Sequence, residues 1–206
     1  MTYSKEYIDR AEEVILHTYN RFQIVLDKGN GVHLYDVDGK EYLDFAAGIA
    51  VFALGYNNQA YNQALKDQID KVIHTSNLYY NPVQAQFAGE LCRAAGMSRA
   101  FLCNSGAEAN ECAIKLARKY SFDKYGADRY NVITLVNSFH GRTIATLTAT
   151  GQGVFHNYFG PFNEGFQYVK AGDIDALTEM VDRHTCAVML ELVQGEGGVV
   201  ALEPEY

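Results

Sequence analysis

The spacing of hydrophobic and polar residues changes several times along this chain of 206 residues. Residues 5–20 have a helical composition without a breaker and predict an N-terminal helix. From residue 23 to residue 45 the pattern changes to short β-prone runs, and two of these, VHLYDV and KEYLDF, flank Asp38-Gly39. Because that dipeptide suits a tight turn, the stretch predicts a β-hairpin.

Helical spacing returns after the hairpin. Apolar residues between 61 and 73 predict a helix with Asn57 or Asn58 as its N-cap, and Asn81-Pro82 predicts the start of another. A strand is expected at 100–103, followed by an amphipathic helix. We expect the apolar face of that helix to carry Ala109, Cys112, Ala113, Leu116, Ala117 and Tyr120.

Two later runs, 132–136 and 186–193, are almost continuously apolar, which is typical of strands buried on both faces of a parallel sheet. Between them, Asp173 is placed to cap a helix that reaches about Arg183. Strands that alternate with helices predict an α/β fold with a mainly parallel sheet. Because such sheets bind ligands at the carboxyl ends of their strands, the chemistry is expected in those loops.

Composition and charge narrow the class of protein. Lys and Arg number 17 against 25 Asp and Glu, which gives a formal net charge of −8 without any basic run. This balance argues against a nucleic-acid partner, since phosphate binding needs clustered Lys and Arg. The longest apolar stretch, 45–55, is too short to span a bilayer, and the first ten residues lack an apolar signal segment. We therefore expect a cytoplasmic protein with no membrane partner.

The cysteines and histidines suggest no metal or disulfide chemistry. The four cysteines form no CxxC pair and lie in apolar contexts, so they are expected to be buried, reduced thiols. The six histidines are scattered without a paired ligand spacing, so no metal site is expected.

Three loops that follow predicted strands are the candidates for function. The first, NSGAEAN at 104–110, combines small residues with a helix start, where free N–H groups favour an anion. It lacks the glycine and lysine pattern of nucleotide-binding loops, and taken alone it is equally well a capped helix start.

The second loop, NSFHGR at 137–142, offers an aromatic ring to cover a planar ligand and an arginine to bind a carboxylate. The third, ELVQGEGG at 191–198, runs from a strand into a glycine-rich turn with two carboxylates. Taken singly, the second is more simply a buried Phe and a surface Arg, and the third a flexible loop with solvated charges. Their combination and order are far more specific.

The order of NSGAEAN, SFHGR and QGEGG, preceded by LYDVDGKEYLDFAAGIAV, resembles the class III pyridoxal-phosphate aminotransferases. AGIAV, HTSNLYY and the TGQ after SFHGR are similar to the acetylornithine branch of that family. The resemblance implies a fold type I transferase that is a homodimer with its site at the interface. It also implies that residues 1–55 belong to the small domain and residues 56–206 begin the large pyridoxal-phosphate-binding domain.

The resemblance also implies roles for individual residues. The family's phosphate-binding turn and the ring-stacking aromatic with its neighbour match Ser105, Gly106, Ala107, Phe139 and His140. Arg142 matches the residue that binds the substrate carboxylate, and Glu196 matches a gate glutamate that pairs with an arginine far downstream. Glu191, on the strand that enters the same loop, is a weaker candidate for substrate binding.

Two departures from the family pattern bear on the substrate. The usual Glu-Pro before the Gln-Gly-Glu run is here Glu191-Leu192, and Phe52 and Tyr56 replace polar residues near the expected substrate side. Further, the cofactor's chemistry needs a lysine for the internal aldimine and an acid at the pyridine nitrogen. None of the nine lysines has the family's context for the aldimine lysine, so we interpret the chain as about the N-terminal half of the enzyme, inactive alone.

The leading hypothesis is transfer of the terminal amino group of N-acetylornithine to 2-oxoglutarate, as in arginine biosynthesis. Ornithine, succinylornithine and 4-aminobutyrate remain alternative amino donors within the family. A cofactor-binding or dimerising module without catalysis is the alternative from another class. A nucleotide-binding α/β domain is the weakest interpretation, because no dinucleotide or P-loop motif is present.

Overall fold

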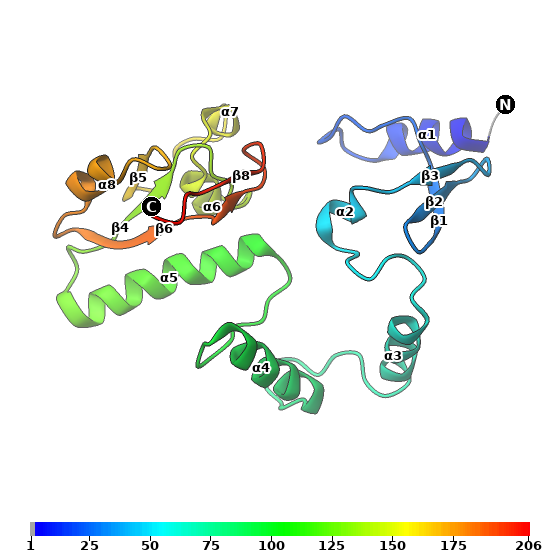
Figure 1. The fold of residues 1–206 in the computed structure, drawn as a ribbon, viewed down its shortest axis with the longest axis horizontal. Helices are drawn as coiled ribbons and strands as arrows, with labels where there is room; N and C mark the ends of the chain where they lie inside the picture. The colour runs from blue at the N-terminus through cyan, green and yellow to red at the C-terminus, as the bar shows by residue number, and fades with distance from the viewer. Residues whose placement is uncertain (1–2) are drawn as a thin grey trace. The chain divides into compact units, whose positions relative to one another are not determined.

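The computed structural model describes residues 3–206. The chain forms two compact units, Met1–Ala85 and Gln86–Tyr206. Each unit has its own three-stranded sheet, drawn in blue in the first unit and in yellow-green to orange in the second (Figure 1). The domain boundary expected after residue 55 stays a prediction.

The first unit contains an antiparallel sheet in the order β1-β2-β3. Its elements are α1 (Tyr3–Val14), β1 (Leu26–Asn30), β2 (His33–Asp36), β3 (Glu41–Leu43), α2 (Ala47–Ala50) and α3 (Gln59–Ile69). The predicted hairpin is confirmed, because β2 and β3 pair across a turn in which Gly39 has a φ of +86°. Glycine adopts this left-handed conformation without a steric cost.

Sequence patterns located the helix starts better than the helix ends. The Asn58 side chain accepts the Tyr61 N–H at 3.0 Å and caps α3, as predicted. Asn81 accepts the Gln84 N–H at 3.1 Å at the start of α4 (Pro82–Ala95), also as predicted. In contrast, α1 ends at Val14 and not near residue 20. The following residues include β-branched and aromatic side chains, which favour helices less.

The second unit carries a parallel sheet in the order β5-β4-β6. Its elements after α4 are α5 (Gly106–Tyr125), β4 (Asn131–Leu135), α6 (Ile144–Ala149), α7 (Gly153–His156), β5 (Phe166–Val169), α8 (Ile174–Met180), β6 (Thr185–Met189), β7 (Val193–Gln194) and β8 (Val200–Ala201). Asp173 caps α8 by accepting the Ala176 N–H, as predicted, although the helix ends at Met180. The arrangement confirms the α/β class.

The central strand β4 forms the core of this unit. Its residues 132–135 are buried on both faces, as the apolar run predicted. Ile133 and Leu135 pack with Val169 of β5 and with apolar side chains of α8. Since β4 and β6 are parallel, the segments that leave their carboxyl ends, 136–142 and 190–198, emerge at the same edge of the sheet.

Two strand predictions are corrected by the structure. Residues 100–103 are not a strand, because no neighbouring segment in the described chain pairs with them. The run 186–193 is not one strand either: β6 ends at Met189, and the last residue of the run, Val193, begins β7, which pairs with β8. β6 is only partly buried, so its apolar character does not come from burial on both faces within this unit.

The face of α5 that packs inward also differs from the prediction. Ile114 and Ser121, two turns apart, are its buried residues, whereas Leu116 and Tyr120 are exposed. The expectation of buried cysteines is wrong in the described chain, where Cys103 is exposed and the other three are half-buried. Among residues 3–206, no helix is both long and apolar enough to cross a membrane.

Candidate functional site

The N-terminus of α5 is shaped by a serine cap. Ser105 has an extended backbone, and its Oγ accepts the Glu108 N–H at 3.2 Å. The Glu108 carboxylate folds back to accept the Asn104 N–H at 2.7 Å, a variant of the capping box. The N–H groups of Gly106 and Ala107 lie in the same first turn, where helices have no internal acceptors. The cap and the anion site expected from the sequence are therefore compatible.

The loop after β4 folds directly onto this helix start. The Asn110 side chain donates to the His140 carbonyl oxygen at 2.8 Å, and the His140 N–H donates to Thr150 Oγ1 at 2.9 Å. Gly141, with a φ of +132°, approaches so closely that a Cβ atom there would lie 2.8 Å from the Ala107 Cβ. A side chain at residue 141 would therefore push the two loops apart.

Beside these contacts lies an open pocket of about 370 Å³. Its lining residues are Gly106, Ala107, Asn110, Phe139, His140, Gly141 and Arg142. The Arg142 guanidinium carbon lies 5.6 Å from the centroid of the Phe139 ring, and the Phe155 ring meets Phe139 edge-on at 5.7 Å. The first residues of α5, an aromatic residue and an arginine thus line one volume of the size that small-molecule sites have.

His140 is the buried polar group of this pocket. Only 4% of its surface is exposed, and its Nε2 has no hydrogen-bond partner among the described residues. Burial lowers the pKa of the imidazole, against an opposing effect of the Glu191 charge. The ring is therefore neutral near pH 7. Because a buried nitrogen without a partner is costly, His140 Nε2 is suited to a hydrogen bond with a bound ligand.

Glu191 joins the third loop to the second. One of its carboxylate oxygens accepts the Phe139 N–H at 2.8 Å, and the other accepts the Gly195 N–H at 3.4 Å. Glu191 also lines, with Phe139 and His140, a neighbouring pocket of about 440 Å³ between α5 and β6. These contacts fix the backbone that carries the Phe139 ring.

Glu196 lies in the glycine-rich turn and is exposed. Its carboxylate accepts a hydrogen bond from Gln152 Nε2 at 2.5 Å, and it is not among the residues that line the 370 Å³ pocket. The structure thus brings Gly106, Ala107 and the 139–142 loop together around one pocket, with Ser105 capping the helix at its rim. Glu196 is tied to Gln152 beside them.

Three residues that support the site were not assigned a role from the sequence: Asn110, Thr150 and Gln152. Asn110 closes the NSGAEAN motif, so its place in that motif was the available signal. Thr150 and Gln152 belong to the segment TGQ, which indicated a branch of the family without indicating a contact. Their partners are 10 to 44 residues away in sequence, which no local pattern encodes.

The two aromatic residues of the first unit that replace polar residues of the family pattern contact each other. The Phe52 and Tyr56 rings stack at 4.8 Å, and the Tyr56 hydroxyl donates to Asp44 Oδ2 at 2.7 Å. This hydrogen bond lowers the pKa of Asp44 and raises that of Tyr56. The Tyr56 ring also fills the space beside Gly29, where a Cβ atom would lie 2.5 Å from it. The pair is therefore a packed unit within residues 3–85.

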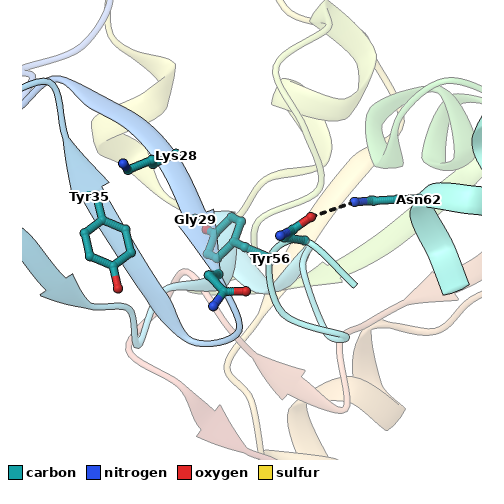
Figure 2. A pocket seen from close by; sticks show the side chains of 7 residues that line it. Lys28, Gly29, Tyr35, Tyr56 and Asn62 are labelled. Atoms are coloured by element: carbon teal, nitrogen blue, oxygen red, sulfur yellow. Dashed lines mark hydrogen bonds between the residues drawn. The ribbon is translucent and has the colours of Figure 1, made fainter. Parts of the chain in front are cut away.

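Tyr56 and Gly29 line an open pocket of about 660 Å³ in this unit (Figure 2). The side chains of Lys28 and Tyr35 stand on one side of it, and the dashed line marks the 3.1 Å hydrogen bond from Asn62 to Asn57. Its polar groups are amides, phenols and one ammonium. Among the residues that line it, no buried side-chain nitrogen or oxygen lacks a hydrogen-bond partner, whereas His140 Nε2 does in the second unit, so the 370 Å³ pocket is the stronger candidate.

Comparison with known proteins bears on the family to which the chain belongs. Residues 14–206 match the family described as aminotransferase class-III. The acetylornithine aminotransferase of Caldanaerobacter subterraneus subsp. tengcongensis is 50% identical over the whole chain, and that of Methanocaldococcus jannaschii is 45% identical over 98% of it. The chain covers 51% of each of these relatives, so it spans about half the length of the curated relatives it matches.

Solved structures show the same fold. An ornithine aminotransferase from Toxoplasma gondii ME49 superposes with a TM-score of 0.94 at 31% identity, over 100% of this chain and 49% of that one. The N-acetylornithine aminotransferase from Stenotrophomonas maltophilia K279a gives 0.76 at 38% identity, over 95% and 47%. These similarities confirm the predicted fold type I architecture. The chain belongs to the class-III aminotransferase family.

Proposed function

We propose that the complete protein is a pyridoxal-phosphate-dependent aminotransferase that moves the terminal amino group of N-acetylornithine to 2-oxoglutarate. The observation that carries this proposal is the pocket in which the start of α5, the Phe139 ring and Arg142 meet. The names of the relatives support the choice of substrate, because the proteins at 44–50% identity are called acetylornithine aminotransferases.

The residues present fit pyridoxal phosphate. Ser105, Gly106 and Ala107 offer a helix N-terminus to the phosphate, and Phe139 offers its face to the pyridine ring. His140 supplies a buried nitrogen that is still without a partner among the described residues. When bound, pyridoxal phosphate supplies an aldehyde that takes up the amino group and a ring that withdraws electrons.

Arg142 is proposed to bind the substrate carboxylate. A guanidinium can hold a carboxylate through two parallel hydrogen bonds, which fixes both the position and the orientation of the substrate. Its place beside the Phe139 ring sets the amino acid next to the plane in which the cofactor's ring would lie. Glu191 supports this arrangement indirectly, because it holds the Phe139 backbone.

The test is a comparison of amino donors with the complete natural protein. We expect kcat/KM to be highest for N-acetylornithine, ahead of succinylornithine, ornithine and 4-aminobutyrate, with 2-oxoglutarate as acceptor. A higher value for another donor would move the protein to another branch of the family. A protein that binds pyridoxal phosphate reversibly and leaves all four donors unchanged would instead be a non-catalytic binding module.

We further propose that the protein acts as a homodimer in the cytoplasm. The support is the family resemblance together with the many exposed apolar side chains, which commonly mark surfaces that contact other protein. Sedimentation equilibrium of the complete protein tests the oligomeric state, and a monomer at micromolar concentration would contradict it.

A further inference from the structure

The glycine-rich turn that carries Glu196 is fixed through its backbone. Gln194 is buried, and its side-chain amide donates to the Val136 carbonyl oxygen at 2.9 Å. Gly197 lies so close to the backbone of Asn137 that a Cβ atom at residue 197 would be 2.4 Å from the Asn137 carbonyl oxygen. The main chain of the turn is therefore docked on the segment that follows β4.

The Glu196 side chain is held differently. It projects from this fixed turn into an exposed position, and the contact found for its carboxylate is the Gln152 amide. The same Gln152 nitrogen donates to the Ser138 carbonyl oxygen at 3.2 Å. Gln152 is thus hydrogen-bonded to the loop 137–142, and it also holds the Glu196 carboxylate of the loop 191–198.

A neutral donor gives this tether a particular property. The amide of Gln152 orients the carboxylate without cancelling its charge, and it does not titrate. A guanidinium or ammonium group makes stronger, charge-assisted hydrogen bonds and can therefore take the carboxylate from Gln152. Because the turn itself is docked, this exchange requires only side-chain rotation of Glu196.

We infer that Gln152 is a positioning residue that holds the Glu196 carboxylate away from the 370 Å³ pocket, so that a substrate with a second carboxylate can enter. This inference rests on the proposed function. Two carboxylates repel each other in a confined site, so a free Glu196 disfavours 2-oxoglutarate more than it disfavours a donor with a single carboxylate. Gln152 therefore affects the use of 2-oxoglutarate as amino acceptor more than the use of N-acetylornithine as amino donor.

Replacing the tether tests this in the complete protein loaded with its cofactor. We expect Gln152→Leu, which removes the donor, to raise the KM for 2-oxoglutarate about tenfold, as expected for one hydrogen bond to a charged group. The KM for N-acetylornithine and for pyruvate, which lacks a second carboxylate, should change less than twofold. Gln152→Lys should instead lower the KM for 2-oxoglutarate, because an ion pair with the lysine would hold Glu196 away from the pocket more firmly. The same variant should lower kcat/KM for N-acetylornithine.

Binding of glutarate, a dicarboxylate that does not react, gives a readout without turnover. Calorimetry should show weaker glutarate binding in Gln152→Leu and unchanged or tighter binding in Gln152→Lys. If the wild-type protein binds glutarate but transfers no amino group, the proposed function fails while this inference is still decided by binding. Equal losses for glutarate and pyruvate in both variants would overturn it, since a purely structural role affects all ligands alike.

The chain offers a matched control. Gln86 donates to the Glu90 carboxylate at 3.0 Å on the exposed surface of α4. This pair also joins a glutamine amide to a glutamate carboxylate, but it lies within one helix and neither residue lines the 370 Å³ pocket. Gln86→Leu should leave the KM for 2-oxoglutarate and the affinity for glutarate unchanged. A shift there equal to that of Gln152→Leu would show that loss of any such pair has a general effect, and would contradict the assignment.

Discussion

The two sheets of this protein are stabilised by different means. In the parallel sheet, Ile133 and Leu135 of β4 are fully buried and pack between neighbouring elements. In the antiparallel sheet of the first unit, the residue that is buried is Asp36, the only one among residues 3–85. Its carboxylate accepts hydrogen bonds from the N–H groups of Asp38 and Lys40 and from the Tyr42 hydroxyl.

This difference explains where the candidate site lies. The loops at the carboxyl ends of β4 and β6 start from a packed core, so their side chains can be held within the small tolerances that binding needs. The first unit instead exposes many large apolar side chains, including Ile73 and Leu78. Its turns are fixed by polar contacts, and its apolar residues require other protein surface to be buried.

The largest expected effect is on the free energy of unfolding, and it differs between a core substitution in the second unit and a matching substitution in the first. Ile133→Ala should lower the free energy of unfolding by about 2–5 kcal/mol, because it removes buried methyl groups and leaves a cavity. Ile73→Ala truncates a side chain that is 80% exposed within the described residues, so it should change this free energy by less than about 0.5 kcal/mol unless protein surface outside the first unit covers it. Denaturant unfolding of the complete protein measures both values.

The result for Ile73→Ala also sharpens the comparison. A cost above about 2 kcal/mol would mean that Ile73 is buried in the complete protein by surface outside the first unit. A small cost for Ile133→Ala would contradict the assignment of β4 as the core, because a fully buried isoleucine cannot be truncated without loss of packing.

A smaller effect is expected where residue 141 approaches Ala107, at the contact between the loops 104–110 and 137–142. Gly141→Ala should weaken pyridoxal-phosphate binding at least tenfold, because the added Cβ atom would meet Ala107 and Thr146 Oγ1 within 2.8 Å. Absorbance titration of the protein with the cofactor measures the affinity. Gly126→Ala is the matched control, since Gly126 also has a positive φ, +88°, but has nothing within 4 Å of such a Cβ.

The two variants distinguish crowding from backbone strain. Both should lose stability, because alanine is disfavoured at positive φ. Only Gly141→Ala should also lose affinity for pyridoxal phosphate. Equal affinity in the two variants would show that the approach of residue 141 to Ala107 does not shape the pocket.

Much of the fold followed from local patterns, and two of the errors share one physical cause. Asn58, Asn81 and Asp173 were recognised as caps because a cap bonds to a backbone N–H three residues away. The segment 100–103 has the composition of a strand, but a strand also needs a partner, and a pattern within four residues carries no information about that. The inward face of α5 is likewise chosen by the sheet that it meets.

The candidate site was predicted in its parts and not in its connections. The motifs indicated Phe139, His140 and Arg142, and the structure places them around one pocket. The tie between Gln152 and Glu196 was missed, because it joins residues 44 apart whose proximity depends on β4 and β6 being neighbours. Residue type predicts what a side chain can do, while topology decides which partner it meets.

The next effect concerns the polar turn of the first unit. In Asp36 burial raises the pKa, but hydrogen bonds from Lys40, Tyr42 and Asp38 outweigh burial, so that the pKa lies below its usual 3.8. Asp36→Asn should therefore speed amide hydrogen exchange of Asp38 and Lys40, because a neutral amide accepts these bonds less strongly. Exchange of the Val132 amide in β4 should stay unchanged, and a matching increase there would show that the units do not unfold separately.

The smallest expected effect is a difference in the pH at which the two units lose stability. His140 in the second unit has a pKa below its usual 6.5, so the unfolded chain binds a proton there first, and stability falls as the pH drops below about 6.5. Asp36 and Asp44 in the first unit have pKa values below 3.8, so their contribution is lost only below about pH 3.8. Hydrogen exchange corrected for its intrinsic pH dependence should therefore show β4 weakening between pH 6.5 and 5 while β2 is unaffected. His140→Gln should remove that loss in β4, since a glutamine gains no proton, and Asp44→Asn should not. If the loss of stability in β4 persists in His140→Gln, the imidazole is not its source. The two units would then not differ in pH dependence through the buried His140 and the hydrogen-bonded Asp36 and Asp44.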